Sequence, residues 1–112
     1  MKLEVKESYN AVVISLIGEI TGGRKNAEFS AALHKCLDEG KKNVVVDLAE
    51  TLYMDSSGIG MLISGYTTMK NGGGALKLAR LTDKIESLLV ITKLNSVFET
   101  FDTLDAALKS FA

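Results

Sequence analysis

Three polar residues in a row interrupt an apolar stretch in the middle of this chain. Asp55, Ser56 and Ser57 stand between Leu52-Tyr53-Met54 and Gly58-Ile59-Gly60. A carboxylate accepts hydrogen bonds, and a serine hydroxyl can carry a phosphoryl group, which adds about −1.5 to −2 charges. The segment therefore offers three kinds of chemistry: helix capping, nucleophilic catalysis and reversible modification.

Apolar residues at helical spacing follow this segment and predict a helix over residues 57–71, closed by three glycines at 72–74. Asp55 or Ser56 is expected to be its N-cap, which explains one polar residue but not three in a row. Free N–H groups and the macrodipole at a helix start favour an anion. A phosphate on Ser56 would therefore change the surface more than the fold, as a reversible binding switch requires. Gly60 and Gly65 fall inside this helix, where they are expected to permit close packing.

The motifs of two enzyme classes are incomplete here. A nucleophile elbow needs G-x-S-x-G and a triad histidine, whereas this segment reads D-S-S-G-I-G and His34 is the only histidine. Gly58 and Gly60 supply only the first half of a G-x-G-x-x-G phosphate loop. With Cys36 as the only cysteine, no structural zinc site is expected. We therefore expect a binding protein that is not an enzyme and has no cofactor.

The surrounding elements follow from the spacing of apolar residues. Strands are expected at residues 3–6, 11–17, 44–48 and 75–81, with a short edge strand at 97–101. The first two should form a hairpin through a turn at 8–10, and 44–48 should be central. The first helix is expected from residue 24 to a glycine cap at 40, and the second at 57–71. A third should run through 85–89 after a capping box of Asp83 and Glu86. The last should run through 104–111 after a cap at Asp102 or Thr103. The stretch at 18–23 is expected to be a flexible loop. Cys36 is expected in the core and His34 on the surface.

Composition is typical of a single globular domain, here residues 1–112. The 112 residues are 46% hydrophobic and 24% charged, with a net charge of −1. This balance gives no basic field for nucleic acid, so no direct nucleic-acid partner is expected. The first ten residues lack the apolar core of a signal peptide, and no apolar run is long enough to span a membrane, so we expect a cytoplasmic protein without a membrane partner. Strands that alternate with helices predict an α/β fold with a mixed sheet.

The chain from Val44 to Leu108 resembles a STAS domain of the anti-sigma factor antagonist type. The resemblance rests on the apolar strand ending in Asp47-Leu48, the D-S-S-G-I-G turn, the helix closed by glycines, "LKL", and the "LL…TKL…VF" region. It implies a mixed sheet of four or five strands with about four helices mainly on one face.

The resemblance also implies a function and its residues. The unphosphorylated antagonist would bind an anti-sigma factor serine kinase and so release a sigma factor. The kinase would phosphorylate Ser56, binding would be lost, and a PP2C-type phosphatase would restore it. Asp55, Ser57 and Gly58 would belong to the same partner-binding surface. Glu19 and Thr21 would join it from a loop that often reads G-E-L-D in the family, so Thr21 stands where an acid is common.

Two further functions remain open at this point. Some STAS domains serve signalling or transport assemblies as subunits, and others bind small ligands such as nucleotides. A convincing set of nucleotide-contacting residues is missing from this sequence.

Overall fold

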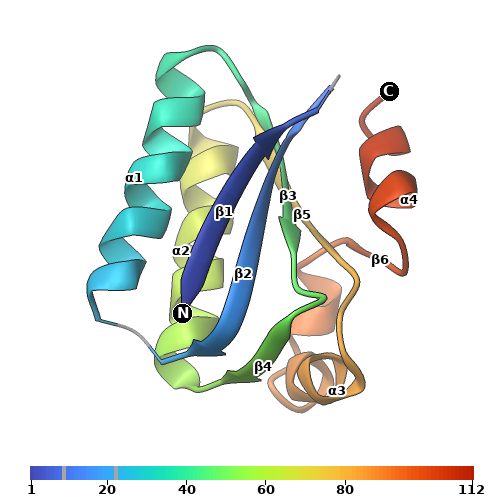
Figure 1. Ribbon diagram of the computed structural model, residues 1–112. Helices are drawn as coiled ribbons and strands as arrows, with labels where there is room; N and C mark the ends of the chain where they lie inside the picture. Colours follow the sequence, from blue (N-terminus) through green and yellow to red (C-terminus); the bar gives the residue numbers. More distant parts are fainter. Residues whose placement is uncertain (9, 22) are drawn as a thin grey trace.

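The computed structural model describes residues 1–8, 10–21 and 23–112, and Figure 1 shows the arrangement of their helices and strands. A mixed sheet forms the middle of the molecule, with helices on both of its faces. In chain order the elements are β1 (Lys2–Glu7), β2 (Val12–Ile20), α1 (Arg24–Asp38), β3 (Asn43–Asp47), β4 (Thr51–Met54), α2 (Ser56–Asn71), β5 (Ala75–Ala79), α3 (Asp83–Ile91), the 3-10 turn η1 (Leu94–Ser96), β6 (Thr100–Phe101) and α4 (Leu104–Lys109).

Strand β2 organises the sheet because it pairs with three neighbours. The sheet has six strands in the order β1-β2-β3-β5-β6, and β4 pairs with β2 beside this path. β1 is antiparallel to β2, and the other pairs are parallel. The first half of β2 pairs with β3, and its last residues pair with β4 after a register shift between Gly18 and Glu19. The predicted α/β class is confirmed, and β4 is one strand more than the sequence predicted.

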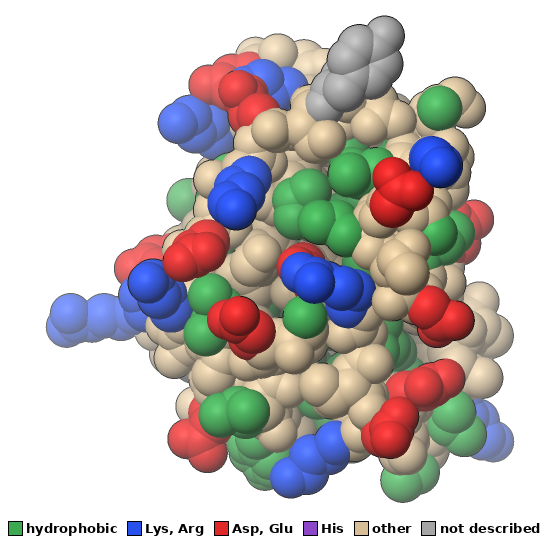
Figure 2. Space-filling view, turned by 45° about the vertical axis from the view of Figure 1, so that its right-hand side comes forward, with side chains coloured by type: hydrophobic (Ala, Val, Ile, Leu, Met, Phe, Trp, Pro, Cys, Tyr) green, Lys and Arg blue, Asp and Glu red, His purple; other side chains and the backbone are tan. Residues whose placement is uncertain are grey.

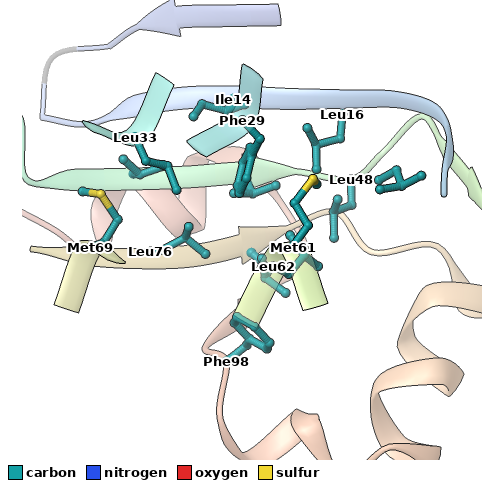
Figure 3. Packing of buried hydrophobic residues seen from close by; sticks show 14 of the residues in the cluster. Ile14, Leu16, Phe29, Leu33, Leu48, Met61, Leu62, Met69, Leu76 and Phe98 are labelled. Atoms are coloured by element: carbon teal, nitrogen blue, oxygen red, sulfur yellow. The ribbon is translucent and has the colours of Figure 1, made fainter. Parts of the chain in front are cut away.

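Most of the helical surface covers one face of the sheet. α1 and α2 lie side by side there (Figure 1), and side chains such as Phe29 and Leu62 fill the main core between helices and sheet (Figure 3). α4 covers the opposite face, where Ala107 packs in a smaller cluster with Val45. Val44 belongs to the main core instead. β3 is therefore a central strand buried on both faces, as its unbroken apolar run predicted.

A charged pair joins the ends of β3 and β5. The Nε–H of Arg80 donates to Asp47 Oδ1 at 3.0 Å, and a second guanidinium N–H donates to Oδ2. Asp47 is buried, and these hydrogen bonds raise the pKa of Arg80. Arg80 has a φ of 56°, a left-handed conformation that costs roughly 1–2 kcal/mol for a non-glycine residue. The pairing with Asp47 and a 2.9 Å hydrogen bond from the Arg80 N–H to Phe101 O hold Arg80 in this conformation.

Elsewhere on the face that carries α4, acidic and basic side chains are interspersed (Figure 2).

The predictions for Cys36 and His34 are confirmed. Cys36 is buried on α1, where burial raises the pKa of its thiol, so it acts as a small core residue. His34 is exposed on the same helix. The last helix was predicted to be capped by Asp102 or Thr103. The cap is Thr103, whose Oγ1 accepts the N–H of Ala106 at 3.0 Å.

The expectations for the loop at 18–23 and for the cap of the third helix are wrong. Gly18, Glu19 and Ile20 do not form a flexible loop but extend β2, because β4 offers them a parallel partner. The cap of α3 is Thr82, one residue before the predicted Asp83, and its hydroxyl accepts the N–H of Ile85. Tyr9 of the predicted turn and Gly22 of the predicted loop lie outside the described residues.

The two glycines inside α2 have different surroundings. A Cβ on Gly65 would come within 2.7 Å of Phe29 and 2.9 Å of Leu33, so Gly65 brings α2 close to α1 as expected. A Cβ on Gly60 would meet nothing within 4 Å, so the packing role expected for Gly60 is wrong.

This difference predicts opposite effects of one substitution at two positions of α2. Gly60→Ala should raise the free energy of unfolding by about 0.5–1 kcal/mol, because alanine favours the helix and meets open space. Gly65→Ala should have a free energy of unfolding about 1–3 kcal/mol below that of Gly60→Ala, because its methyl group overpacks the contact with α1. Urea unfolding of both variants measures this, and equal stabilities would contradict the close contact at Gly65.

Candidate functional site

The ends of two parallel strands bring the predicted site residues together. Glu19 pairs with Tyr53 and Ile20 with Met54, so β2 and β4 end side by side. Thr21 follows β2, and Asp55 follows β4. The sequence had suggested that the polar segment follows the central strand. In the structure it follows the short strand β4 instead. Both stretches still reach the carboxyl edge of the sheet, where ligands and partners of α/β folds bind.

Asp55 is the N-cap of α2. Its backbone is extended, and its Oδ1 accepts the N–H of Gly58 at 3.0 Å. Its carbonyl oxygen accepts the N–H of Ile59 at 3.0 Å, which closes the first turn. Of the two candidates for the cap, the structure therefore selects Asp55. Ser56 is the first residue of the helix and is exposed, so its hydroxyl is not committed to capping.

The start of α2 rests directly on the end of β2. The N–H of Asp55 donates to the carbonyl oxygen of Ile20 at 3.2 Å. A Cβ on Gly58 would lie 2.5 Å from that same oxygen and 2.6 Å from Met54 Cγ. Only glycine allows this approach, and Gly58 is accordingly buried. Gly58 was predicted in the partner-binding set; its surroundings show a packing role beneath the exposed serines.

The exposed part of the site consists of Ser56, Ser57, Glu19 and Thr21, while Asp55 is half-buried. All residues of the first turn of α2 are described, and none of them has an acidic side chain. Its leading N–H groups have no partner within the helix, and the macrodipole places partial positive charge there. This end of the helix can therefore accommodate a phosphoryl group on Ser56.

Sequence reasoning missed the apolar surface beside these residues. Leu52 and Tyr53 of β4 are 69% and 42% exposed, and the Nζ of Lys84 on α3 lies 5.7 Å from the Tyr53 ring centroid. Both side chains leave apolar surface exposed at the end of β4. The missed signal was the short strand itself, because Thr51 and Met54 are its buried ends and Leu52 and Tyr53 its exposed middle.

Other kinds of site find less support in the described part of the chain. Within those residues, no group of three or more His, Cys, Asp or Glu side chains is placed to hold a metal ion. Among the helices that the structure describes, none is long and apolar enough to cross a membrane.

Comparison with known proteins defines the family. A family model described as the STAS domain matches residues 2–107, and the chain belongs to this family. The chain is 27% identical over 103 residues to the anti-sigma-B factor antagonist of Bacillus subtilis (strain 168), covering 88% of this chain and 89% of that protein.

Two solved structures illustrate the range of proteins with this fold. One is the Bacillus cell fate determinant SpoIIAA in its phosphorylated form, with a TM-score of 0.76, 17% identity and coverage of 99% of this chain and 100% of that chain. The other is a sulfate transporter family protein from Wolinella succinogenes, with a TM-score of 0.76, 18% identity and coverage of 88% and 81%. At such identities the likeness shows the shared fold alone.

The capping geometry yields a prediction for three variants. Asp55→Ala should lower the free energy of unfolding by about 0.5–2 kcal/mol, because the N–H of Gly58 loses its acceptor. Asp55→Asn keeps an acceptor and should be nearly neutral, and Ser56→Ala should also change little. Denaturant unfolding of the three variants tests the assignment. A larger loss in Ser56→Ala than in Asp55→Ala would make Ser56 the cap instead.

Proposed function

We propose that this chain is an anti-sigma factor antagonist whose binding is switched by phosphorylation of Ser56. The observation that carries the proposal is the exposed Ser56 hydroxyl at the first position of α2, directly after an aspartate that already supplies the cap. The name of the Bacillus subtilis relative supports the antagonist function. The phosphorylated form named for SpoIIAA supports regulation by phosphate.

The partner that fits this function is an anti-sigma factor with serine kinase activity. In the unphosphorylated state the chain binds the kinase and a sigma factor is released. The kinase transfers a phosphoryl group to Ser56 Oγ, and a PP2C-type phosphatase later removes it. The chain itself acts through binding and not catalysis.

The switch follows from the different demands of folding and binding. A phosphate on Ser56 faces water and the positive end of α2, so the fold tolerates it. A bound partner would have to remove water from that phosphate, which directly follows Asp55 in the chain. Burying an uncompensated charge in an interface is costly, and like charges brought together cost several kcal/mol. Phosphate therefore disfavours the complex while it leaves the domain folded.

The partner surface that we propose combines both strand ends. Asp55, Ser56 and Ser57 supply its centre, and Glu19 and Thr21 reach it from β2 because of the parallel pairing with β4. Gly58 contributes from beneath by setting the position of the first turn.

Membership in a transport assembly is the competing function, since the fold also occurs in a sulfate transporter family protein. The exposed serine after the capping aspartate favours the switch, because transport does not require an acceptor hydroxyl at this position.

Incubation with a cognate anti-sigma factor kinase and ATP should phosphorylate Ser56. Its hydroxyl is exposed and is not used for capping. Peptide mass spectrometry locates the phosphate, with Ser56→Ala expected to abolish labelling and Ser57→Ala to retain it. Phosphate found only on Ser57 or on the exposed Ser64 would overturn the assignment.

A second prediction tests whether the end of β2 takes part in the interface. Thr21→Asp adds a carboxylate at an exposed position where related domains often carry an acid, so it should tighten kinase binding by about 0.2–1 kcal/mol. Titration calorimetry measures this, and circular dichroism should show an unchanged fold. Ser8→Asp is the matched control, because it adds the same charge beyond the far end of β2. Equal dissociation constants for both variants and the unmodified protein would place Thr21 outside the interface.

A further inference from the structure

A groove lies between α1 and α2 and extends from Asn26 and Ser57, near the helix starts, to Leu33 and Thr68. The close contact of Gly65 with Phe29 and Leu33 forms part of its lining. Gly60 also lines it, and a side chain there would meet open space. The resulting groove has a volume of about 330 Å³, at the lower end of the range for small-molecule sites.

The lining of this groove has a distinct chemistry. Ser30 of α1 and Ser57, Ser64 and Thr68 of α2 supply hydroxyl groups from both walls. Apolar side chains, among them Met61, form the floor. Among the described residues that line the groove, none has an ionisable side chain. A charged ligand would lose water here without gaining a counter-charge, so this lining favours an uncharged one.

Asn26 adds an unused hydrogen-bond acceptor. It lines the groove from the first turn of α1, and its Oδ1 is buried without a hydrogen-bond partner in the part of the chain that the structure describes. Buried polar atoms are nearly always paired, and an unpaired one is destabilising. A ligand N–H or O–H that reaches this oxygen would remove that penalty. The oxygen is inaccessible as it stands, so the amide must rotate about its last side-chain torsion, which is soft, to face a ligand in the groove.

We propose that the groove between α1 and α2 binds a small uncharged molecule with an apolar body and an N–H or O–H donor. The apolar body packs on the floor, the hydroxyl walls bond its polar edge, and the donor pairs with Asn26 Oδ1. Ser57 lines the groove next to Ser56, so an occupied groove would alter the surface that a kinase meets; this consequence rests on the proposed function.

Three ring compounds of similar shape and different charge test the proposal. Benzamide is neutral and has an N–H donor, benzoate is an anion, and benzamidinium is a cation. Titration of the ¹⁵N-labelled protein with benzamide should shift the amide signals of Asn26, Ser57, Gly60 and Ser64 saturably, with a dissociation constant on the order of millimolar for so small a ligand. Benzoate and benzamidinium should bind at least about tenfold more weakly, because the groove offers no counter-charge.

Variants locate the binding. Gly60→Leu fills the groove from a position with open space, so it should remain folded and lose benzamide binding. Thr67→Leu adds the same side chain at an exposed position of α2 outside the groove and should bind normally. Asn26→Leu should weaken binding by about five- to tenfold without lowering the melting temperature. Should Gly60→Leu fail to fold, Ser64→Leu fills the groove from the next turn.

These binding experiments use no kinase. A failure of the groove proposal would therefore leave the phosphorylation switch untouched. Absence of saturable shifts, equal binding of the three compounds, or unchanged binding in the groove-filling variant would each overturn the proposal.

Discussion

The backbone carbonyl of Ile20 fixes the place where α2 begins, and the geometry of the site depends on this contact. It accepts the N–H of Asp55 and lies so close to Gly58 that any side chain there would collide with it. The contact exists because β2 continues past β3 and pairs with β4. One carbonyl thus joins the end of one strand, the end of another and the first turn of a helix. The exposed serines directly follow this junction.

This arrangement separates the residues that hold the helix from those that face a partner. Asp55 caps the first turn and Gly58 packs beneath it, while Ser56 and Ser57 remain exposed. A group added to Ser56 therefore alters no contact on which the helix depends. The Asp47–Arg80 pair holds the carboxyl ends of β3 and β5 together through contacts that do not involve the site residues.

The features that could be predicted from the sequence are those set by residues close together in the chain. The cap was narrowed to Asp55 or Ser56 because residue type at a helix start is a local signal, and the helix after it followed from apolar spacing. β4 was missed because its partner, residues 18–20, lies more than thirty positions earlier and looks like a glycine-rich loop. The packing role of Gly58 was hidden for the same reason, since the atom it approaches belongs to Ile20. The unpaired Asn26 oxygen depends on how α1 packs in the folded chain, which no single segment reveals.

The central claim is that negative charge at Ser56 acts on binding and not on folding, and one paired measurement on Ser56→Asp tests it most directly. Charge at the start of α2 should change the free energy of unfolding by only about 0.3–1 kcal/mol, in the stabilising direction. Kinase binding should weaken by more than this, because like charges brought together in an interface can cost several kcal/mol. The effect should be smaller than that of phosphate, which carries more charge. Urea unfolding and titration calorimetry on the same preparation give both quantities, with Ser57→Asp as the neighbouring control. Our account predicts a folded Ser56→Asp protein with clearly weakened binding; an unfolded protein, or a folded one that binds as tightly as the unmodified chain, would contradict it.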